Sequence, residues 1–358
     1  MSNEWAEMLK NLGVEPDVSE LPEVTEAQHG PDVSVQLHDL SDWSVVDVTG
    51  ADAASFLQGQ FCNDLQQVSI TRAQITGYCT PKGRLLALPT IVGIEGGFRL
   101  LIKSAVKDAF IKRLSMFIMR SDVTLSDRDD LMCSGVVADS ANSVGDLQGA
   151  LGTLPFAPLD VATSESSQLI RWHDDHVSQT RHRFVHIANQ ADSTAMWNST
   201  GSERQSFARW RAGDISAGIP SITEGTSESF VPQMINLQLI DALSFTKGCY
   251  PGQEIVARMQ YLGKLKRHMR LFKLPGGDAP TVPGAKLSVG EDADAGTVID
   301  AVTINHTGEG EESRHTLLIA VVKVSSDAST LLFEGRELEA LDLPYDLPSL
   351  EDGSNEST

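Results

Sequence analysis

The sequence predicts an α+β protein that consists of two mixed α+β units followed by a small antiparallel β-barrel. Strand-like and helix-like segments interleave up to residue 266 without regular βαβ spacing or a Gly-rich phosphate loop, which argues against a doubly wound sheet. From Arg267 onward, strand-like runs follow one another between Gly, Asp, Ser and Pro residues, as is typical of a small barrel. A length of 358 residues is consistent with two or three packed units.

The ends of the chain differ from its centre. Residues 1–32 are acidic and contain several prolines, so we expect them to be partly flexible, although Trp5, Met8, Leu9 and Leu12 recur at helical spacing. The predicted division is an N-terminal segment 1–32, a first unit 33–130 plus 225–266, a second unit 131–224, a barrel 267–346 and a disordered acidic tail 347–358.

Local patterns predict the elements of the first unit. Two apolar runs are joined by Pro81-Lys82-Gly83-Arg84, which indicates a hairpin in which Gly83 adopts a positive φ. The expected elements are strands at 43–48, 75–80, 85–92 and 98–102 and helices at 51–58 and 105–118.

The second unit and the barrel follow from the same periodicities. In the second unit we expect strands at 131–138, 169–172 and 184–187 and a helix around 203–211. The barrel strands are expected at 269–274, 296–304, 315–324, 330–335 and 337–343.

Composition excludes several classes of protein. No stretch of eighteen uncharged apolar residues occurs, so a membrane-spanning helix is not expected. The first residues lack the basic start and apolar run of a secretion signal, which favours the cytoplasm. The four cysteines, Cys62, Cys79, Cys133 and Cys249, are scattered without a CxxC pair, so we expect no disulfide framework, no metal site and no iron–sulfur cluster held by this chain alone.

The charge of the chain argues against a protein that grips nucleic acid. The formal net charge is −21, whereas nucleic-acid binding needs a basic surplus to contact phosphates. Basic residues gather locally at Lys264, Lys266, Arg267, Arg270 and Lys273, which we interpret as a solvated strand face rather than an anion site.

The most distinctive segment runs from Thr246 to Glu254. Pro251 suits the first position of a helix, so Cys249 would lie just before a helix start, where the dipole favours a thiolate, and Lys247 could lower the thiol pKa further. Gly248 and Gly252 would allow close approach of a backbone or a flat ligand. The expected helix continues with Ile255, Met259 and Leu262 on one face.

Two other interpretations of Cys249 stay open on local chemistry alone. A cysteine in a glycine-rich turn is often an inert residue that simply fits. A cysteine protease is a weaker alternative, because it needs a histidine base and none of the nine histidines is locally paired with Cys249.

Lys247 to Glu254, with the sequence KGCYPGQE, resembles the K-G-C-Y-x-G-Q-E signature of the YgfZ family, which is related to the glycine-cleavage T-protein. Every fixed position of that signature is present. Further similarity, in the family's order, occurs at Phe56–Gln60, at Asn63-Asp64, at Cys79 with Lys82-Gly83, and at Leu343-Pro344-Tyr345.

This resemblance implies a T-protein-like ring of three domains around a central cavity that holds tetrahydrofolate or another folate. Trp43 and Trp210 resemble the family's folate-associated tryptophans, and an indole suits a flat pterin ring. The signature residues Gly248, Gly252, Gln253 and Glu254 are further expected cofactor contacts. Arg258, Lys247 or the basic run near Arg267 could hold the anionic glutamate tail.

The resemblance also implies a function, with alternatives. The leading hypothesis is a folate-binding accessory protein that supports iron–sulfur cluster assembly or repair and tRNA methylthiolation, with Cys249 as a reactive thiol, Lys247 beside it, and iron–sulfur enzymes or assembly proteins as partners. No stable direct contact with nucleic acid or membrane is expected. The second hypothesis is a tetrahydrofolate-dependent one-carbon transferase of the aminomethyltransferase type, and the third is a non-catalytic folate-sensing module. Leu86 and Ala87 stand where the T-protein has its acidic pair, so aminomethyl transfer itself is not expected.

Overall fold

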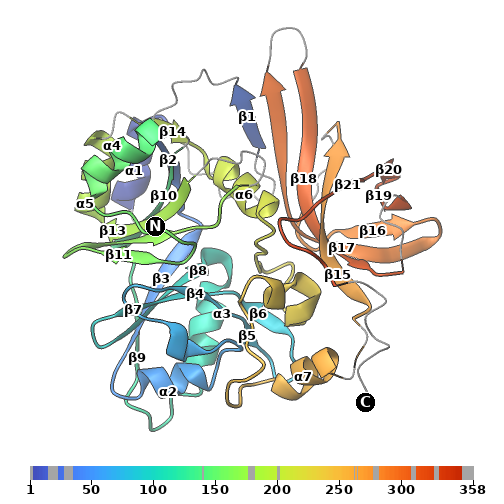
Figure 1. Ribbon diagram of the computed structural model, residues 1–358, viewed down its shortest axis with the longest axis horizontal. Helices are drawn as coiled ribbons and strands as arrows, with labels where there is room; N and C mark the ends of the chain where they lie inside the picture. Colours follow the sequence, from blue (N-terminus) through green and yellow to red (C-terminus); the bar gives the residue numbers. More distant parts are fainter. Residues whose placement is uncertain are drawn as a thin grey trace.

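Three structural units surround a central helix (Figure 1). The computed structural model describes residues 3–14, 23–27, 35–138, 141–175, 182–199, 202–261, 263, 265–276, 282–307, 312–325 and 330–348. Within these ranges the strands form a five-stranded, a six-stranded and an eight-stranded sheet and one two-stranded hairpin, accompanied by helices. This is the predicted α+β class, and the same ranges contain no helix long and apolar enough to cross a membrane.

The first unit is an antiparallel sheet in the order β4-β7-β8-β3-β9, with helix α3 packed against it. Its elements are β3 (Trp43–Thr49), α2 (Ala53–Gln58), η1 (Leu65–Gln67), β4 (Gln74–Ile75), β7 (Thr90–Ile94), β8 (Gly97–Lys103), α3 (Ser104–Ser115) and β9 (Thr124–Asp127). Helix α3 buries Val106, Phe110 and Leu114, which recur at helical spacing and therefore form one apolar face.

The predicted hairpin is present, but its strands are shared between two sheets. β5 (Tyr78–Cys79) pairs with β6 (Leu85–Ala87), whereas β4 pairs with β7 in the larger sheet. Gly83 in the turn has a φ of 69°, as predicted, and glycine is the residue that adopts such a positive φ easily.

The second unit is a six-stranded sheet in the order β11-β12-β13-β10-β2-β14. Its elements are β2 (Gln36–Asp39), β10 (Leu131–Ala138), α4 (Ala141–Leu151), β11 (Val161–Thr163), β12 (Ser167–Arg171), β13 (His182–Asn189), α5 (Gln190–Ser199), β14 (Glu203–Gln205) and α6 (Phe207–Ser216). The helix expected around 203–211 begins at Phe207, because residues 203–205 pair with β2 as a strand. The predicted first unit includes β2, whereas the hydrogen-bond partners of β2 lie in this second sheet.

The N-terminal segment packs on the other units. The predicted amphipathic helix is α1 (Asn3–Asn11), and its Trp5 and Leu9 are buried in the second unit, where Trp5 meets Trp197 edge to face at a ring-centroid distance of 6.0 Å. A strand that the sequence did not indicate, β1 (Glu23–Ala27), runs parallel to a barrel strand.

The C-terminal unit is the predicted barrel. Its strands are β15 (Arg267–Pro275), β16 (Lys286–Val289), β17 (Asp292–Thr307), β18 (Glu312–Lys323), β19 (Leu332–Phe333), β20 (Arg336–Glu337) and β21 (Glu339–Leu341). They follow the order β20-β19-β16-β17-β18-β15-β21, and β20 also contacts β15, so the sheet nearly closes on itself.

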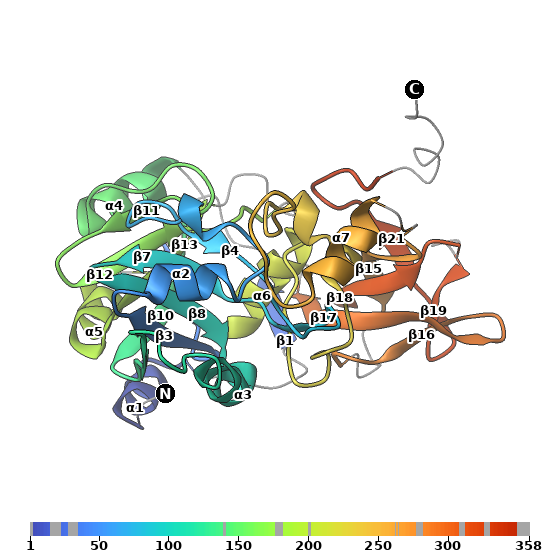
Figure 2. The same ribbon diagram turned by 90° about the horizontal axis from the view of Figure 1, so that it is seen from below.

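Helix α6 joins the units at the centre of the molecule. Every residue of this helix except Arg209 is buried, and its Trp210 and Ile215 belong to a core cluster that also contains Leu101 of β8 and Ile319 of β18. Figure 2 shows α6 between the sheets of the α+β units and the barrel. The remaining elements, η2 (Pro232–Ile235), η3 (Leu237–Leu239) and α7 (Gln253–Tyr261), lead from this centre into the barrel.

Candidate functional site

A central cavity of about 310 Å³ lies where the two α+β units meet the barrel. Its walls come from the turn between β2 and β3, the junction of β8 and α3, helix α6 and barrel strand β17. Residues that line it include Ser41, Asp42, Lys103, Phe207, Arg211 and Asp300. A narrow recess, which shares Lys103, Arg211 and Asp300 with this cavity, continues to two tryptophans.

The recess is walled by Trp43 and Trp172. Their ring centroids are 5.3 Å apart at an interplanar angle of 75°, so the two indoles meet edge to face. The Nε1 atom of Trp43 is buried and has no hydrogen-bond partner among the described residues. An aromatic wall with one unsatisfied donor suits a flat, polar ring.

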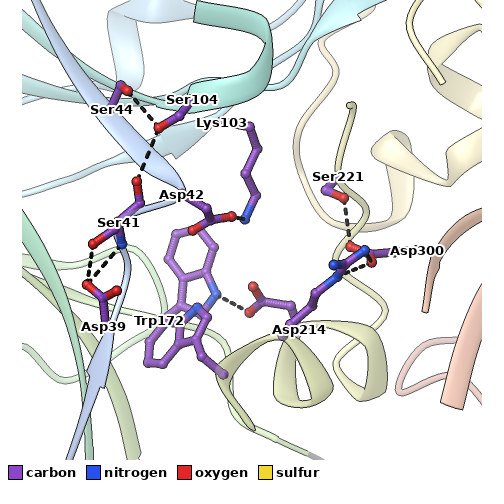
Figure 3. A network of polar contacts seen from close by, with 12 residues as sticks. Asp39, Ser41, Asp42, Ser44, Lys103, Ser104, Trp172, Asp214, Ser221 and Asp300 are labelled. Carbon is purple, nitrogen blue, oxygen red and sulfur yellow. Dashed lines mark hydrogen bonds and ion pairs between the residues drawn. The ribbon is translucent and has the colours of Figure 1, made fainter. Parts of the chain in front are cut away.

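Asp42 and Lys103 form an ion pair at the mouth of the recess (Figure 3). The β3–β8 register places Lys103 opposite Trp43, and the ammonium lies 2.6 Å from Oδ2 of Asp42 and 4.9 Å from the centroid of the Trp43 ring. Burial raises the pKa of Asp42, and the attraction of Lys103 offsets this only in part. The second oxygen, Oδ1, is buried without a partner among the described residues, so it can accept a hydrogen bond from a ligand.

A second set of charges faces this pair. Arg211 of α6 forms an ion pair with Asp300 of β17, and Ser221 Oγ donates to Asp300 Oδ2 at 2.7 Å. Asp214, one turn further along α6, accepts hydrogen bonds of 2.8 Å from Trp172 Nε1 and from Arg183. Figure 3 shows the Ser221–Asp300 contact on the barrel side of the recess and the Trp172–Asp214 contact beside it, so the polar network joins all three units around the cavity.

This donor and acceptor set fits a folate. The pterin ring is flat and presents amino and amide donors, and the cavity and its recess offer two indoles together with the carboxylates Asp42, Asp214 and Asp300. Lys103 and Arg211 are the cations of this lining, and they are the residues available to an anionic group.

Of the two predicted tryptophans, Trp43 lines the recess and Trp210 does not. Trp210 is 1% exposed, the Arg183 guanidinium lies 4.0 Å from its ring centroid, and a Cβ on Gly135 would come within 2.4 Å of the ring. The second indole of the recess is Trp172, for which the sequence predicted only a place in a strand. Trp172 is the last residue of the predicted strand 169–172, and a tryptophan at a strand end was the available signal for a cavity wall.

Lys247 serves to hold the signature loop in place. Its ammonium donates to the backbone carbonyls of Gln58, Phe61 and Asn63 at 2.7, 2.6 and 2.7 Å, and burial lowers its pKa to about 8. All three donors of the ammonium are therefore used by the first unit. This geometry assigns Lys247 to the loop rather than to the Cys249 thiol.

Gly252 and Gly83 interlock the signature loop with the β5–β6 hairpin. A Cβ on Gly252 would lie 2.5 Å from the Thr80 carbonyl oxygen and 2.6 Å from Gly83 Cα, and the φ of Gly252 is 86°. Helix α7 therefore begins at Gln253 rather than at Pro251 as predicted, because a residue with this φ cannot continue an α-helix. The close approach predicted for Gly252 involves backbone.

The loop presents Cys249 at the protein surface. Cys249 is exposed, and nothing lies within 4 Å of a Cβ built on Gly248. On α7, Glu254 lies in the first turn as expected, and both it and Arg258 are exposed.

The face expected for Ile255, Met259 and Leu262 differs from the buried one. Val256 is the buried side chain of α7, whereas Ile255 is 41% exposed, and Leu262 lies outside the described residues. Within the described chain, no residue between 247 and 258 lines the central cavity. The predicted tail-binding residues Lys247 and Arg258 are thus separate from it.

The other three cysteines are buried, and two residues of the basic run form ion pairs. Cys62, Cys79 and Cys133 are buried, and burial raises the pKa of Cys133 to about 12. Arg267 pairs with Asp294 at 2.7 Å, and Lys273 lies 3.8 Å from a Glu339 oxygen across the barrel sheet, which agrees with a solvated strand face. Lys264 lies outside the described residues, and those described contain no cluster of candidate metal ligands.

Similar proteins are known from sequence and from structure, although no protein-family model matches the chain. It is 30% identical over 319 residues to the tRNA-modifying protein YgfZ of Klebsiella pneumoniae, which covers 86% of this chain and 92% of that protein. It is 33% identical over 253 residues to the tRNA-modifying protein YgfZ of Edwardsiella ictaluri, with coverages of 70% and 73%.

A solved structure confirms the architecture. The aminomethyltransferase T of the glycine cleavage system from Bartonella henselae superimposes with a TM-score of 0.72 at 13% sequence identity, over 94% of this chain and 96% of that one. The T-protein-like arrangement predicted from the sequence is therefore the fold of this chain.

Proposed function

Because this chain belongs to the YgfZ family, we propose that it binds a folate in the central cavity and supports tRNA modification. The observation that carries the proposal is the recess between Trp43 and Trp172, with the unsatisfied Nε1 of Trp43 and Oδ1 of Asp42 at its edge. A buried polar atom without a partner is costly, and a ligand that supplies the missing hydrogen bond gains affinity from it.

The proposed ligand is held by this chain's own residues. Trp43 and Trp172 would contact the flat ring, Asp42 would accept from its amino or amide groups, and Lys103 or Arg211 would hold an anionic group. A bound folate would supply one-carbon chemistry, and the chain would supply its position and exclude water. Leu86 and Ala87 leave the hairpin without the acidic pair expected of an aminomethyltransferase.

A more specific role concerns iron–sulfur enzymes. We place Cys249 as a thiol for transient contact with a partner, because the anchored loop holds it outward at the surface. The partners would be iron–sulfur enzymes or their assembly proteins, including those that methylthiolate tRNA. An exposed thiol remote from the cavity favours such an accessory protein over a one-carbon transferase, whose reacting groups should share one cavity.

Folate binding can be tested by tryptophan fluorescence and calorimetry. We expect folate to quench the emission of the wild-type protein, and Trp43→Phe to remove much of the quenching and weaken binding about two- to tenfold. Trp197→Phe is the matched control, since Trp197 packs against Trp5 in the second unit and does not line the cavity. If calorimetry detects no folate binding to the wild-type protein, the proposal fails.

The role of Cys249 can be tested in a bacterial strain that lacks its own YgfZ-family protein. We expect Cys249→Ala to bind folate normally yet fail to restore methylthiolated tRNA, whereas Gly248→Ala, a neighbouring surface change, restores it. Full restoration by Cys249→Ala would remove this thiol from the function and favour a folate-sensing module without it.

A further inference from the structure

A second cavity, which we call the α3 groove, runs along helix α3 and has a volume of about 410 Å³. Ala105, Ala109, Arg113 and Met116 line it at helical spacing, so it extends along about three turns of the helix, roughly 16 Å. The opposite wall is formed by the β5–β6 hairpin and by the chain that follows α6. Its residues are Tyr78, Leu86, Glu224 and Ser227.

The groove contains buried polar atoms that no described residue satisfies. Tyr78 is 1% exposed, and although Arg113 lies close to its phenol, the phenol O–H has no acceptor among the described residues. The same is true of the buried Nε atom of Arg113. Such orphan groups are uncommon in folded proteins, and two of them lining one cavity indicate a ligand that accepts hydrogen bonds from both.

The charges of the lining select an anion. Lys112 and Arg113 are cations, and Glu224 is the one carboxylate among the described lining residues. Burial raises the pKa of Tyr78, an effect that the nearby Arg113 offsets in part, so the phenol is protonated at neutral pH and can donate. A positive surplus is unexpected by chance on a chain whose formal net charge is −21.

The rest of the groove is apolar and firmly built. Leu86, Ala105 and Ala109 offer a surface of aliphatic side chains, and the two alanines leave room for a ligand along the helix. Tyr78 is held in place because its ring meets Phe110 edge to face at a centroid distance of 5.3 Å. A ligand for this groove therefore combines an apolar body with an anionic end.

We propose that the α3 groove binds a carboxylic acid with an apolar body, whose carboxylate is held by Arg113 and Tyr78. The aliphatic part would lie along Ala105, Ala109 and Leu86, and Lys112, at the exposed edge, would attract the anion. The planar guanidinium and the phenol together supply the directed donors that a carboxylate accepts best.

This ligand is distinct from the proposed folate. The groove shares Ala105 and Glu224 with the central cavity, so the two cavities are neighbours. The Glu224 carboxylate lies at their junction and disfavours an anionic tail that passes from one to the other. The proposed ligand of the α3 groove can therefore be tested independently of folate binding.

The test is a calorimetric titration of the full chain with octanoate, and with octylammonium as a probe of the same length and opposite charge. We expect octanoate to bind and octylammonium not to bind. Arg113→Gln should weaken octanoate binding about tenfold, and Tyr78→Phe, which keeps the ring, about fivefold. Arg120→Gln and Tyr261→Phe are matched controls outside the groove, and they should bind like the wild type.

Three results would overturn the proposal: no octanoate binding, equal binding of octylammonium, or unchanged affinity in both Arg113→Gln and Tyr78→Phe. Thermal unfolding without octanoate separates a binding defect from misfolding, because a variant that unfolds at the wild-type temperature but binds octanoate weakly has lost binding alone. Octanoate should bind equally with folate present. Displacement of octanoate by folate would show that the groove is part of the folate site and not a separate one.

Discussion

His186 and His268 of the described chain are buried and His173 is half-buried, and removal from water lowers the pKa of each to about 4. The native state therefore holds them neutral, whereas an unfolded chain protonates them near pH 6.5. His268 shows the consequence directly, since its Nε2 accepts a hydrogen bond from Arg270 Nε at 3.0 Å. A protonated ring could not accept that bond.

We expect these histidines to make the fold sensitive to mild acid. Between pH 6.5 and 4 the unfolded state binds more protons than the native state, so the free energy of unfolding rises with pH across this window and falls on acidification. His186, at 3% exposure, should contribute about 2 kcal/mol of loss at pH 5. Urea unfolding of wild type and His186→Phe at pH 7 and pH 5 measures the difference.

His186→Phe should lose less stability than the wild type between the two pH values. Equal losses in the wild type and in His186→Phe would contradict the inferred neutral state of His186.

Residue type alone did not distinguish side chains that pack in the core from those that line the cavity. The sequence indicates Trp43 and Trp210 equally as folate contacts. In the structure Trp43 lines the recess, whereas Trp210 is buried beneath the Arg183 guanidinium. Lys247 is a second example, because its ammonium donates hydrogen bonds to three backbone carbonyls of a loop distant in sequence. Only tertiary contacts decide these cases.

At the scale of elements, the signature loop and the β5–β6 hairpin form one interlocked unit. Gly252 leaves no room for a side chain against the Thr80 carbonyl, whereas Gly248, in the same loop, faces open space. We expect Gly252→Ala to destabilise the protein by about 2–4 kcal/mol through backbone strain and steric overlap, and Gly248→Ala to change stability by less than about 0.5 kcal/mol. Chemical denaturation of the two variants tests this contrast.

If both alanine variants unfolded at the wild-type denaturant concentration, the loop and hairpin would not be in the contact described. If Gly248→Ala unfolded at the same lowered denaturant concentration as Gly252→Ala, the loop would tolerate a side chain at neither glycine. Either result would also weaken the view that this loop serves as a rigid platform for Cys249.

Elements with strong periodicity were predictable, and those set by pairing were not. The hairpin turn, α3 and the barrel strands β15, β17 and β18 follow local patterns of apolar residues and glycine, and the structure confirms them. The start of α6 was misplaced because residues 203–205 gain backbone partners in β2, a strand far away in sequence. Local propensity carries no information about such partners.

At the scale of the whole molecule, the central cavity exists only because three units meet. Lys103 comes from β8 of the first unit, Asp42 from the turn between β2 and β3, Arg211 from α6 and Asp300 from the barrel. No local spacing in the sequence links these residues, so only the family resemblance indicated a cavity, and it did so without Trp172, Lys103 or Arg211. The polar network, unlike the signature, could therefore not be predicted from the sequence.

The Arg211–Asp300 ion pair, which is buried and ties α6 to the barrel, provides a test of this inter-unit network. We expect Arg211→Met to destabilise the protein by about 3 kcal/mol, because Asp300 then keeps a buried charge with only Ser221 Oγ and the Ala301 amide as hydrogen-bond donors. Adding Asp300→Asn removes that charge, so the double variant should be more stable than Arg211→Met alone. A double-mutant cycle by chemical denaturation measures this coupling. If the two changes were simply additive, the pair would not couple helix and barrel, and the cavity would be held together by apolar packing instead.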